Sequence, residues 1–140
     1  MAIKAEEIMM GNWVSIPNYF RNDEDRLMQV KGLSEDNTLE LSDGKIRTIR
    51  QCKDVDAVVI SEDILLKCGF ERKGRLYQME FFPFSIDFVN DDTYLDDAPI
   101  PDHYALHFNG ATFSHPRMVY LHQLQNLYYS LTGTHLTFKP

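Results

Sequence analysis

One segment near the C-terminus constrains the fold of this chain more than any other. Residues 116–132 read PRMVYLHQLQNLYYSLT and are followed by Gly133. Ser114 or His115 can serve as the N-cap of a helix here, Pro116 is tolerated in its first turn, and Gly133 suits a left-handed C-terminal cap. At about 100° per residue, the apolar side chains share roughly a third of the circumference. These are Tyr120, Leu121, Leu124, Leu127, Tyr128 and Leu131. The pattern predicts a core-facing helix over 116–132.

Composition sets the broad class of protein. The chain has 140 residues, of which 44% are apolar and 12% aromatic, and this is typical of a globular protein with one domain or two very small ones. It contains no apolar run of about 18 residues, and its N-terminus lacks the pattern of a secretory signal. We therefore expect a cytoplasmic protein with no membrane span. Cys52 and Cys68 do not form a Cys-x-x-Cys motif, and Cys68 lies among apolar residues that favour burial.

Charge bears on the choice of partner. The formal net charge is −7, and an acidic chain repels the phosphates on which nucleic-acid affinity depends. Nucleic-acid binding is therefore disfavoured. It stays an alternative because Lys45, Arg47, Arg50 and Lys53 form a local basic cluster.

The first half of the chain is predicted to form short strands. Trp13–Ile16 and Arg26–Leu33 are followed by two alternating runs that flank Asp43-Gly44, which indicates a type I′ hairpin. A two-residue turn would pair Leu41 with Ile46, Leu39 with Thr48 and Glu40 with Arg47. Residues 55–60 would close this group as a further strand.

The second half combines a short helix with more strands. Ser61 is a suitable N-cap for a helix over residues 62–68, and Gly69 would end that helix. Residues 76–82, 84–89 and 103–108 favour strands, and Asn109-Gly110 is typical of a type I′ turn into residues 111–113. Residues 134–138 could add an edge strand.

These elements predict an α+β fold. Residues 1–60 would form a small SH3-like β-barrel. Residues 61–140 would form an α+β half with the short helix 62–68, an antiparallel sheet and the helix 116–132 covering one face of that sheet. The barrel is an analogy of proportions and carries no function by itself.

Three blocks of sequence carry a family resemblance. They are residues 3–14 (IKAEEIMMGNWV), residues 61–71 (SEDILLKCGFE) and residues 120–133 (YLHQLQNLYYSLTG). In this order they resemble a family of small uncharacterised proteins encoded in prophages and mobile elements of Bacteroides-type gut bacteria. The resemblance implies membership of that family. It implies no activity and no catalytic residue.

Histidines and carboxylates offer weak candidates for a reactive site. His103 and His107 are four apart in a predicted strand, about 13 Å along the backbone, which is too far for one metal ion. His115 and His122 lack a nucleophile or an acid at a diagnostic spacing. The carboxylates in 91–102 do not follow an EF-hand pattern: they are Asp91, Asp92, Asp96, Asp97 and Asp102. We therefore expect no catalytic, cofactor-binding or metal-binding residues.

The polar side of the terminal helix is the candidate contact surface. His122, Gln125 and Asn126 lie on this arc, and Tyr129 lies among polar residues outside the apolar stripe. An amphipathic aromatic residue in such a place is typical of an interface. The sequence therefore favours a non-enzymatic accessory protein of a mobile element that acts through protein–protein contacts, as a homodimer or with another protein. The alternatives are a nucleic-acid-binding module that uses the barrel and an enzyme with a site at the junction of the two halves.

Overall fold

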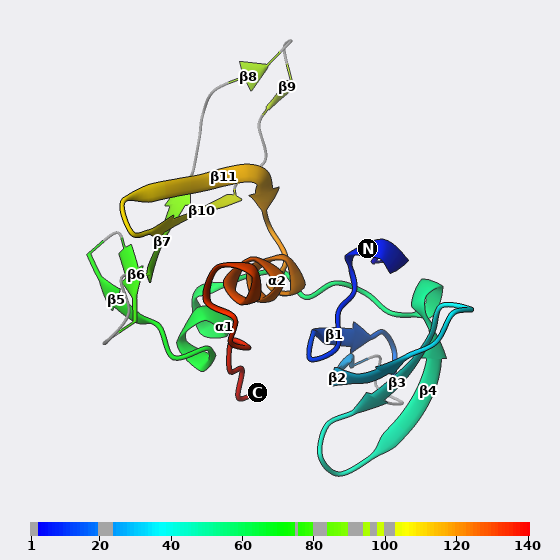
Figure 1. The fold of residues 1–140 in the computed structure, drawn as a ribbon. Coiled ribbons are helices and arrows are strands. Elements are labelled where there is room, and N and C mark those ends of the chain that lie inside the picture. The colour runs from blue at the N-terminus through cyan, green and yellow to red at the C-terminus, as the bar shows by residue number, and fades with distance from the viewer. Residues whose placement is uncertain are drawn as a thin grey trace. The chain divides into compact units, whose positions relative to one another are not determined.

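The computed structural model describes residues 3–19, 24–74, 76–79, 84–89, 94–95, 98–99 and 103–140. The fold is α+β, as predicted, with two antiparallel sheets and a C-terminal helix (Figure 1). The chain divides into two compact units. The first unit contains Met1–Val59, Tyr120–Leu136 and Pro140, and the second contains Ile60–Val119 and Thr137–Lys139.

The first unit is built on a four-stranded antiparallel sheet. Its strands are β1 (Trp13–Ile16), β2 (Arg26–Leu33), β3 (Thr38–Ser42) and β4 (Arg47–Gln51), in that spatial order. Two 3-10 turns, η1 (Ala5–Glu7) and η2 (Cys52–Asp54), flank the sheet in sequence. The bounds of β1 and β2 confirm the predicted strands. The inner side chains form one apolar cluster: Ile3, Ile8, Val14, Ile16, Met28, Val30, Leu39, Leu41, Cys52 and Val55.

The predicted closing strand is reduced to isolated bridges. Ser15 and Asp56 exchange two backbone hydrogen bonds of 2.9 and 2.8 Å, and Val59 bridges to Tyr120. These bridges bring residues 56 and 59 against β1 and the start of the terminal helix. The described residues form an open sheet in which β4 is an edge strand, and they contain no closed barrel.

The β3–β4 hairpin is present, but its predicted register is wrong. Leu41 pairs with Thr48 and Leu39 with Arg50, so the loop is longer than the Asp43-Gly44 dipeptide. The cause is the Asp43 carboxylate, which accepts backbone hydrogen bonds from Lys45 at 2.9 Å and Ile46 at 2.8 Å. This side-chain cap stabilises a wider turn than type I′.

The terminal helix α2 spans Leu121–Thr132, so its predicted start at residue 116 is wrong. Tyr120 is the N-cap, and the Gln123 side chain accepts its N–H at 3.0 Å, in place of the predicted caps Ser114 or His115. The predicted C-terminal cap is confirmed, because Gly133 has a φ of 73°. Tyr120–Leu136 belongs to the first unit, whereas the sequence analysis placed this helix with residues 61–140. The reason is a set of long-range hydrogen bonds from α2 to residues 7–13, described below.

The second unit holds the larger sheet and a short helix. Ser61 caps α1 (Glu62–Lys67) by accepting the Ile64 N–H at 3.3 Å, as predicted. The sheet runs in the order β11-β10-β7-β6-β5. Its strands are β5 (Glu71–Lys73), β6 (Leu76–Gln78), β7 (Phe84–Val89), β10 (His103–Phe108) and β11 (Ala111–Met118), and a separate pair consists of β8 (Tyr94–Leu95) and β9 (Ala98–Pro99). Phe84 packs between Phe70 and Phe108, with ring centroids 6.2 and 5.7 Å away.

Strand β11 occupies residues that the sequence assigned to the start of the terminal helix. It is an edge strand, and its pairing with β10 shifts between Phe113 and Met118. Proline lacks the N–H needed inside a sheet, so an edge strand with an irregular register is where Pro116 can lie. The predicted Asn109-Gly110 turn is confirmed, with φ angles of 49° and 82°. Residues 134–138 form no strand.

Candidate functional site

The polar side of α2 faces the interior of the first unit. Gln125 is only 6% exposed, and its side chain serves two backbone groups of the segment before and within β1. Its oxygen accepts the Trp13 N–H at 2.9 Å, and its nitrogen donates to the Gly11 carbonyl at 3.2 Å. Gln125 therefore satisfies one carbonyl just before β1 and the N–H of the first residue of β1.

Asn126 continues this contact one residue further along the helix. Its oxygen accepts a hydrogen bond from the Asn12 side chain at 2.8 Å, and its nitrogen donates to the Glu7 carbonyl at 2.7 Å. Asn12 is itself buried and accepts the Met9 N–H at 2.8 Å. Together with Gln125, these side chains fasten α2 to residues 7–13. We call Gln125, Asn126 and Asn12 the amide clasp.

His122 is also buried, with 1% of its surface exposed. Its Nε2 lies 3.3 Å from a carboxylate oxygen of Glu7. Burial lowers the pKa of His122 below its ordinary value of 6.5, and the nearby Glu7 carboxylate only partly offsets this effect. The interior therefore favours the neutral imidazole.

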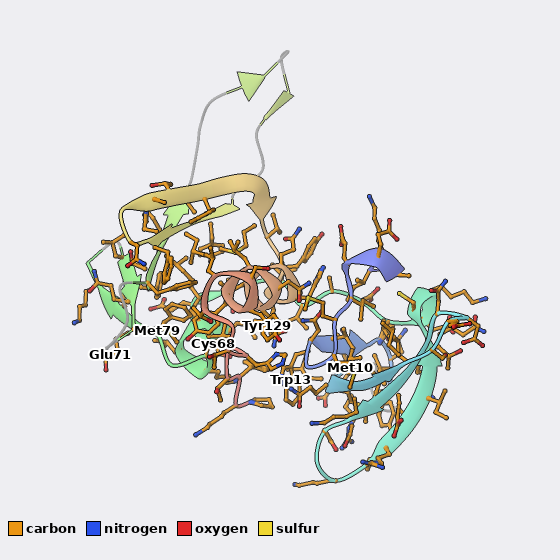
Figure 2. All side chains as sticks on the ribbon, viewed as in Figure 1. Met10, Trp13, Cys68, Glu71, Met79 and Tyr129 are labelled. Atoms are coloured by element: carbon orange, nitrogen blue, oxygen red, sulfur yellow. The ribbon has the colours of Figure 1, made fainter. Side chains whose placement is uncertain are left out.

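The four residues predicted as a contact surface do not form one. His122 and Gln125 are inside, Asn126 is half-buried, and Tyr129 alone is exposed, at 37%. Tyr129, which is labelled in Figure 2, stacks on His135 with ring centroids 4.5 Å apart. The sequence of the polar arc gave no sign of this burial, because its partners are backbone groups and the side chains of Glu7 and Asn12, all more than 100 positions away. The only hint of these contacts in the sequence was the Gly11-Asn12 turn before Trp13, because an irregular segment has backbone groups that need hydrogen-bond partners.

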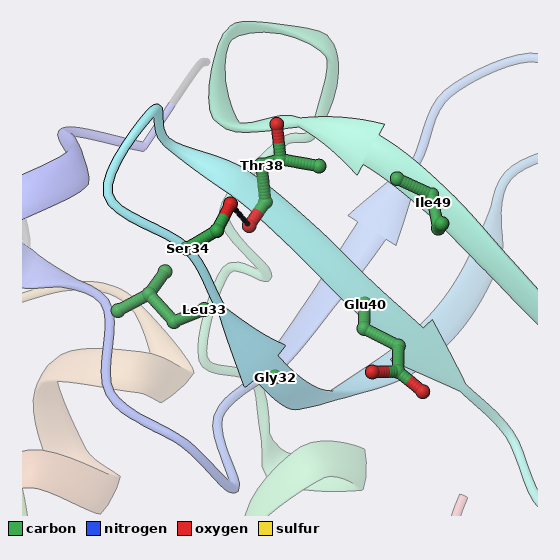
Figure 3. A pocket seen from close by; sticks show the side chains of 6 residues that line it. All are labelled: Gly32, Leu33, Ser34, Thr38, Glu40 and Ile49. Carbon is green, nitrogen blue, oxygen red and sulfur yellow. Dashed lines mark hydrogen bonds between the residues drawn. The ribbon is translucent and has the colours of Figure 1, made fainter.

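A different surface of the first unit has the features of a contact site. Leu33 at the end of β2 is 47% exposed, and Ile49 in β4 is 65% exposed. Both line a groove of about 370 Å³ on the outer side of the sheet, together with Gly32, Glu40, Ser34 and Thr38 (Figure 3). The Ser34 hydroxyl donates to the Thr38 carbonyl at 3.2 Å and fixes one end of this groove. The predicted register placed Arg47 opposite Glu40 and assigned no partner to Ile49, whereas the observed register places Ile49 opposite Glu40.

The basic cluster lies along the same hairpin. Arg47 is 3.6 Å from the Glu40 carboxylate, and the Arg50 guanidinium donates to the Thr48 hydroxyl at 2.5 Å and the Ile49 carbonyl at 2.9 Å. Lys45 and Lys53 are exposed, and neither forms an ion pair within the described part of the chain. Lys53 and Lys4 line a second groove of about 410 Å³, which also contains Asp36. The cluster therefore has carboxylates beside Arg47 and Lys53, and its two lysines form no ion pair with a described residue.

The other histidine and carboxylate candidates do not assemble into a site. His107 is half-buried and hydrogen-bonded to the Thr112 hydroxyl at 3.0 Å. The side chains of His103 and His115 lie outside the described residues, as do all five aspartates of the acidic run, Asp91, Asp92, Asp96, Asp97 and Asp102. Within the ranges that the structure describes, no three His, Cys, Asp or Glu side chains could hold a metal ion.

Both cysteines are free and buried. Burial raises the pKa of the Cys68 thiol to about 12, and burial also raises the pKa of Cys52, whose Sγ lies 3.2 Å from the Ile3 carbonyl. A thiol with a raised pKa is a poor nucleophile at neutral pH. Cys68 is a core side chain, as its apolar neighbours predicted.

Comparisons with family models, with curated proteins and with solved structures gave no match. Among the described residues, no helix has the length and apolar character needed to cross a bilayer.

Proposed function

We propose that this protein is a non-enzymatic binding protein that acts through contact with another protein. The observation that carries the proposal is the groove on the outer side of β2–β4. Scattered apolar residues are normal on a protein surface, but Leu33 and Ile49 line one depression and leave about half or more of their surface in water. Covering both side chains would contribute favourably to association.

The groove depends on the glycine at its floor. A Cβ at position 32 would lie 3.0 Å from a carboxylate oxygen of Glu40 and 3.2 Å from the Glu40 Cβ. Because Gly32 has no side chain, the apolar walls and the Glu40 carboxylate stay accessible across the strands. An apolar side chain of a partner, with a donor directed at Glu40, suits this arrangement.

Three further hypotheses stay predictions. The hypothesis that the protein is an accessory protein of a mobile element rests on the three blocks of family resemblance. An SH3-like barrel for the first unit is supported by the Ser15–Asp56 bridge, which brings the chain after η2 beside β1. Nucleic-acid binding is the alternative function, supported by the cations of the β3–β4 hairpin and opposed by the net charge of −7.

Affinity capture with matched variants tests the proposed function. The wild-type protein, Ile49→Glu and Leu66→Glu are used to capture proteins from extracts of the organism that encodes the chain. Leu66 is the control because it is 48% exposed but lies in α1 of the second unit. We expect a partner that the wild type and Leu66→Glu retain and that Ile49→Glu loses. A set of retained proteins that is identical for all three would contradict the proposal.

A further inference from the structure

Strand β4 presents an unpaired backbone edge. It is the last strand of its sheet, and no described strand pairs with its outer side, where the Ile49 carbonyl accepts a hydrogen bond from the Arg50 side chain (Figure 1). The Cys52 N–H bonds to the Asn37 carbonyl at 2.9 Å and the Ile46 carbonyl accepts from Asp43 at 3.3 Å, so residues 46 and 52 face the β3 side. Antiparallel pairing alternates along a strand. The N–H and C=O groups of Arg47, Ile49 and Gln51 therefore point away from β3.

The side chains along this edge are cationic with an apolar centre. Ile49 is 65% exposed at the middle of the strand, Arg47 is beside it, and Lys45 and Lys53 lie beyond the two ends. The residues from 45 to 53 contain four cations and no acid, in a chain whose net charge is −7. Lysines at an edge often serve only to prevent association. An exposed isoleucine at the centre of the strand works against that role.

From this edge we infer the kind of partner: β4 binds an extended acidic segment of another protein, which adds to the sheet as a further strand. The inference rests on the proposed function and specifies its partner. Backbone hydrogen bonds to residues 47, 49 and 51 hold the segment, its carboxylates lie near Lys45, Arg47 and Lys53, and an apolar residue covers Ile49.

A second copy of this chain fits the edge less well. Antiparallel pairing of two β4 strands about Ile49 would place Arg47 next to Gln51 and gather the cations of both copies on one ribbon. Like charges that face each other across strands are destabilising. Nucleic acid also fits less well, because phosphates do not match the alternating donors and acceptors of a strand edge.

Synthetic peptides test the inference on the intact protein. The probe is the ten-residue peptide Thr-Glu-Thr-Glu-Thr-Val-Thr-Glu-Thr-Glu, in which the central Val and the Glu residues share one face of a strand, as Ile49 and the cations do on β4. Its charge-reversed control has Lys in place of Glu. We expect the acidic peptide to bind about tenfold or more tightly than the control at low salt, with the difference shrinking as salt is added. In ¹⁵N NMR spectra, the largest shifts should occur at the amides of Arg47, Ile49 and Gln51. Equal affinities, or shifts centred on another strand, would overturn the inference.

Backbone methylation separates strand addition from simple charge attraction. Two further acidic peptides carry N-methyl groups on alternate amides. In the first peptide the methyl groups block one edge of the strand, and in the second they block the opposite edge. Strand addition predicts that one of them loses binding and the other keeps it, because only one edge meets β4. Binding that is unaffected in both peptides would contradict strand addition. A single-stranded DNA oligonucleotide that binds more tightly than the acidic peptide would favour the nucleic-acid alternative and overturn the inference.

Charge-reversal variants supply the matched protein controls. Lys45→Glu with Lys53→Glu should weaken the acidic peptide about tenfold, whereas Lys31→Glu with Lys73→Glu has the same change in net charge on other exposed sites and should not. The outcomes separate the two proposals. An Ile49-dependent partner with no acidic-peptide binding leaves the proposed function and removes the inference. Peptide binding at β4 without any Ile49-dependent partner removes the proposed function.

Discussion

The side chains of Asn12 and Asn126 are joined by a hydrogen bond of 2.8 Å across 114 positions of the chain. Each of them also bonds to the backbone of residues 7–9, with Asn12 accepting from Met9 and Asn126 donating to Glu7. This relationship ties the C-terminal helix to the N-terminal segment. It explains why α2 belongs to the first unit, although 60 residues of the second unit precede it in sequence.

The amide clasp should contribute measurably to stability. Gln125→Ala removes the acceptor for the Trp13 N–H and a donor to Gly11 in a buried place, so we expect a loss of about 2 kcal/mol in the free energy of unfolding. Ser130→Ala on the exposed side of α2 is the control and should cost less than about 0.5 kcal/mol. Urea unfolding followed by Trp13 fluorescence measures both. A loss at Gln125 as small as that at Ser130 would contradict the clasp.

A fragment of residues 1–60 should not fold by itself. It contains the four-stranded sheet but lacks Tyr120–Leu136, which belongs to the same unit. Without α2, the Glu7 carbonyl and the Trp13 N–H lose their side-chain partners, and the Gly11 carbonyl loses one of its two side-chain donors and keeps Gln29. We expect poor dispersion of amide signals in NMR spectra. A fragment that unfolds cooperatively with the stability of the whole chain would show that the helix is dispensable for this unit.

His122 should make the protein less stable in mild acid. Burial lowers the folded-state pKa of His122 below 6.5, so the unfolded state binds the proton more readily. The contribution of the neutral side chain is therefore present above pH 6.5 and is lost as the pH falls below that value. We expect His122→Gln to flatten the fall in stability between neutral pH and about pH 5.5, relative to the wild type. Equal slopes for the two proteins over this range would contradict the assignment.

The stability of the turn between β3 and β4 should depend on the side-chain oxygen of Asp43, which accepts two backbone hydrogen bonds. Hydrogen bonds from the backbone of Ile46 and Lys45, with a smaller effect of Arg26, lower the Asp43 pKa from 3.8 to about 2. The stabilisation is therefore present above pH 3.8 and lost as the pH falls towards 2. Asp43→Ala should destabilise the hairpin, whereas Asp43→Asn keeps the acceptor and should destabilise it less. Amide hydrogen exchange at Lys45 and Ile46 measures the stability of the turn in each variant. Identical exchange rates in Asp43→Ala and Asp43→Asn would contradict the role of the acceptor.

Local signals in the sequence predicted the elements whose causes are local. The strands at 13–16, 84–89 and 103–108, the Ser61 cap, the Asn109-Gly110 turn and the Gly133 cap all occur as expected. The hairpin register was missed because Asp43 captures two backbone amides and widens the turn. The start of the terminal helix was missed because residues 116–118 continue strand β11, which pairs with β10, although their apolar periodicity favoured a helix.

The candidate site was harder to predict than the fold. A polar arc on a helix is ordinarily the solvated face, and nothing near Gln125 in the sequence reveals that its partners lie at residues 11 and 13. The exposure of Ile49 is equally non-local, because it follows from the register of β4 on β3 and from the absence of a described strand beyond it. The basic cluster was visible in the sequence, but its place on a sheet edge was not.

Hydrogen exchange of the complex tests the central claim most directly. The partner retained by the wild-type protein is added, and backbone exchange is compared residue by residue with the free protein. Contact through the hairpin predicts slower exchange at Arg47, Ile49 and Gln51 and around Gly32, with Tyr129 and Ser130 unchanged. Slower exchange confined to the exposed side of α2, with β4 unchanged, would contradict the claim.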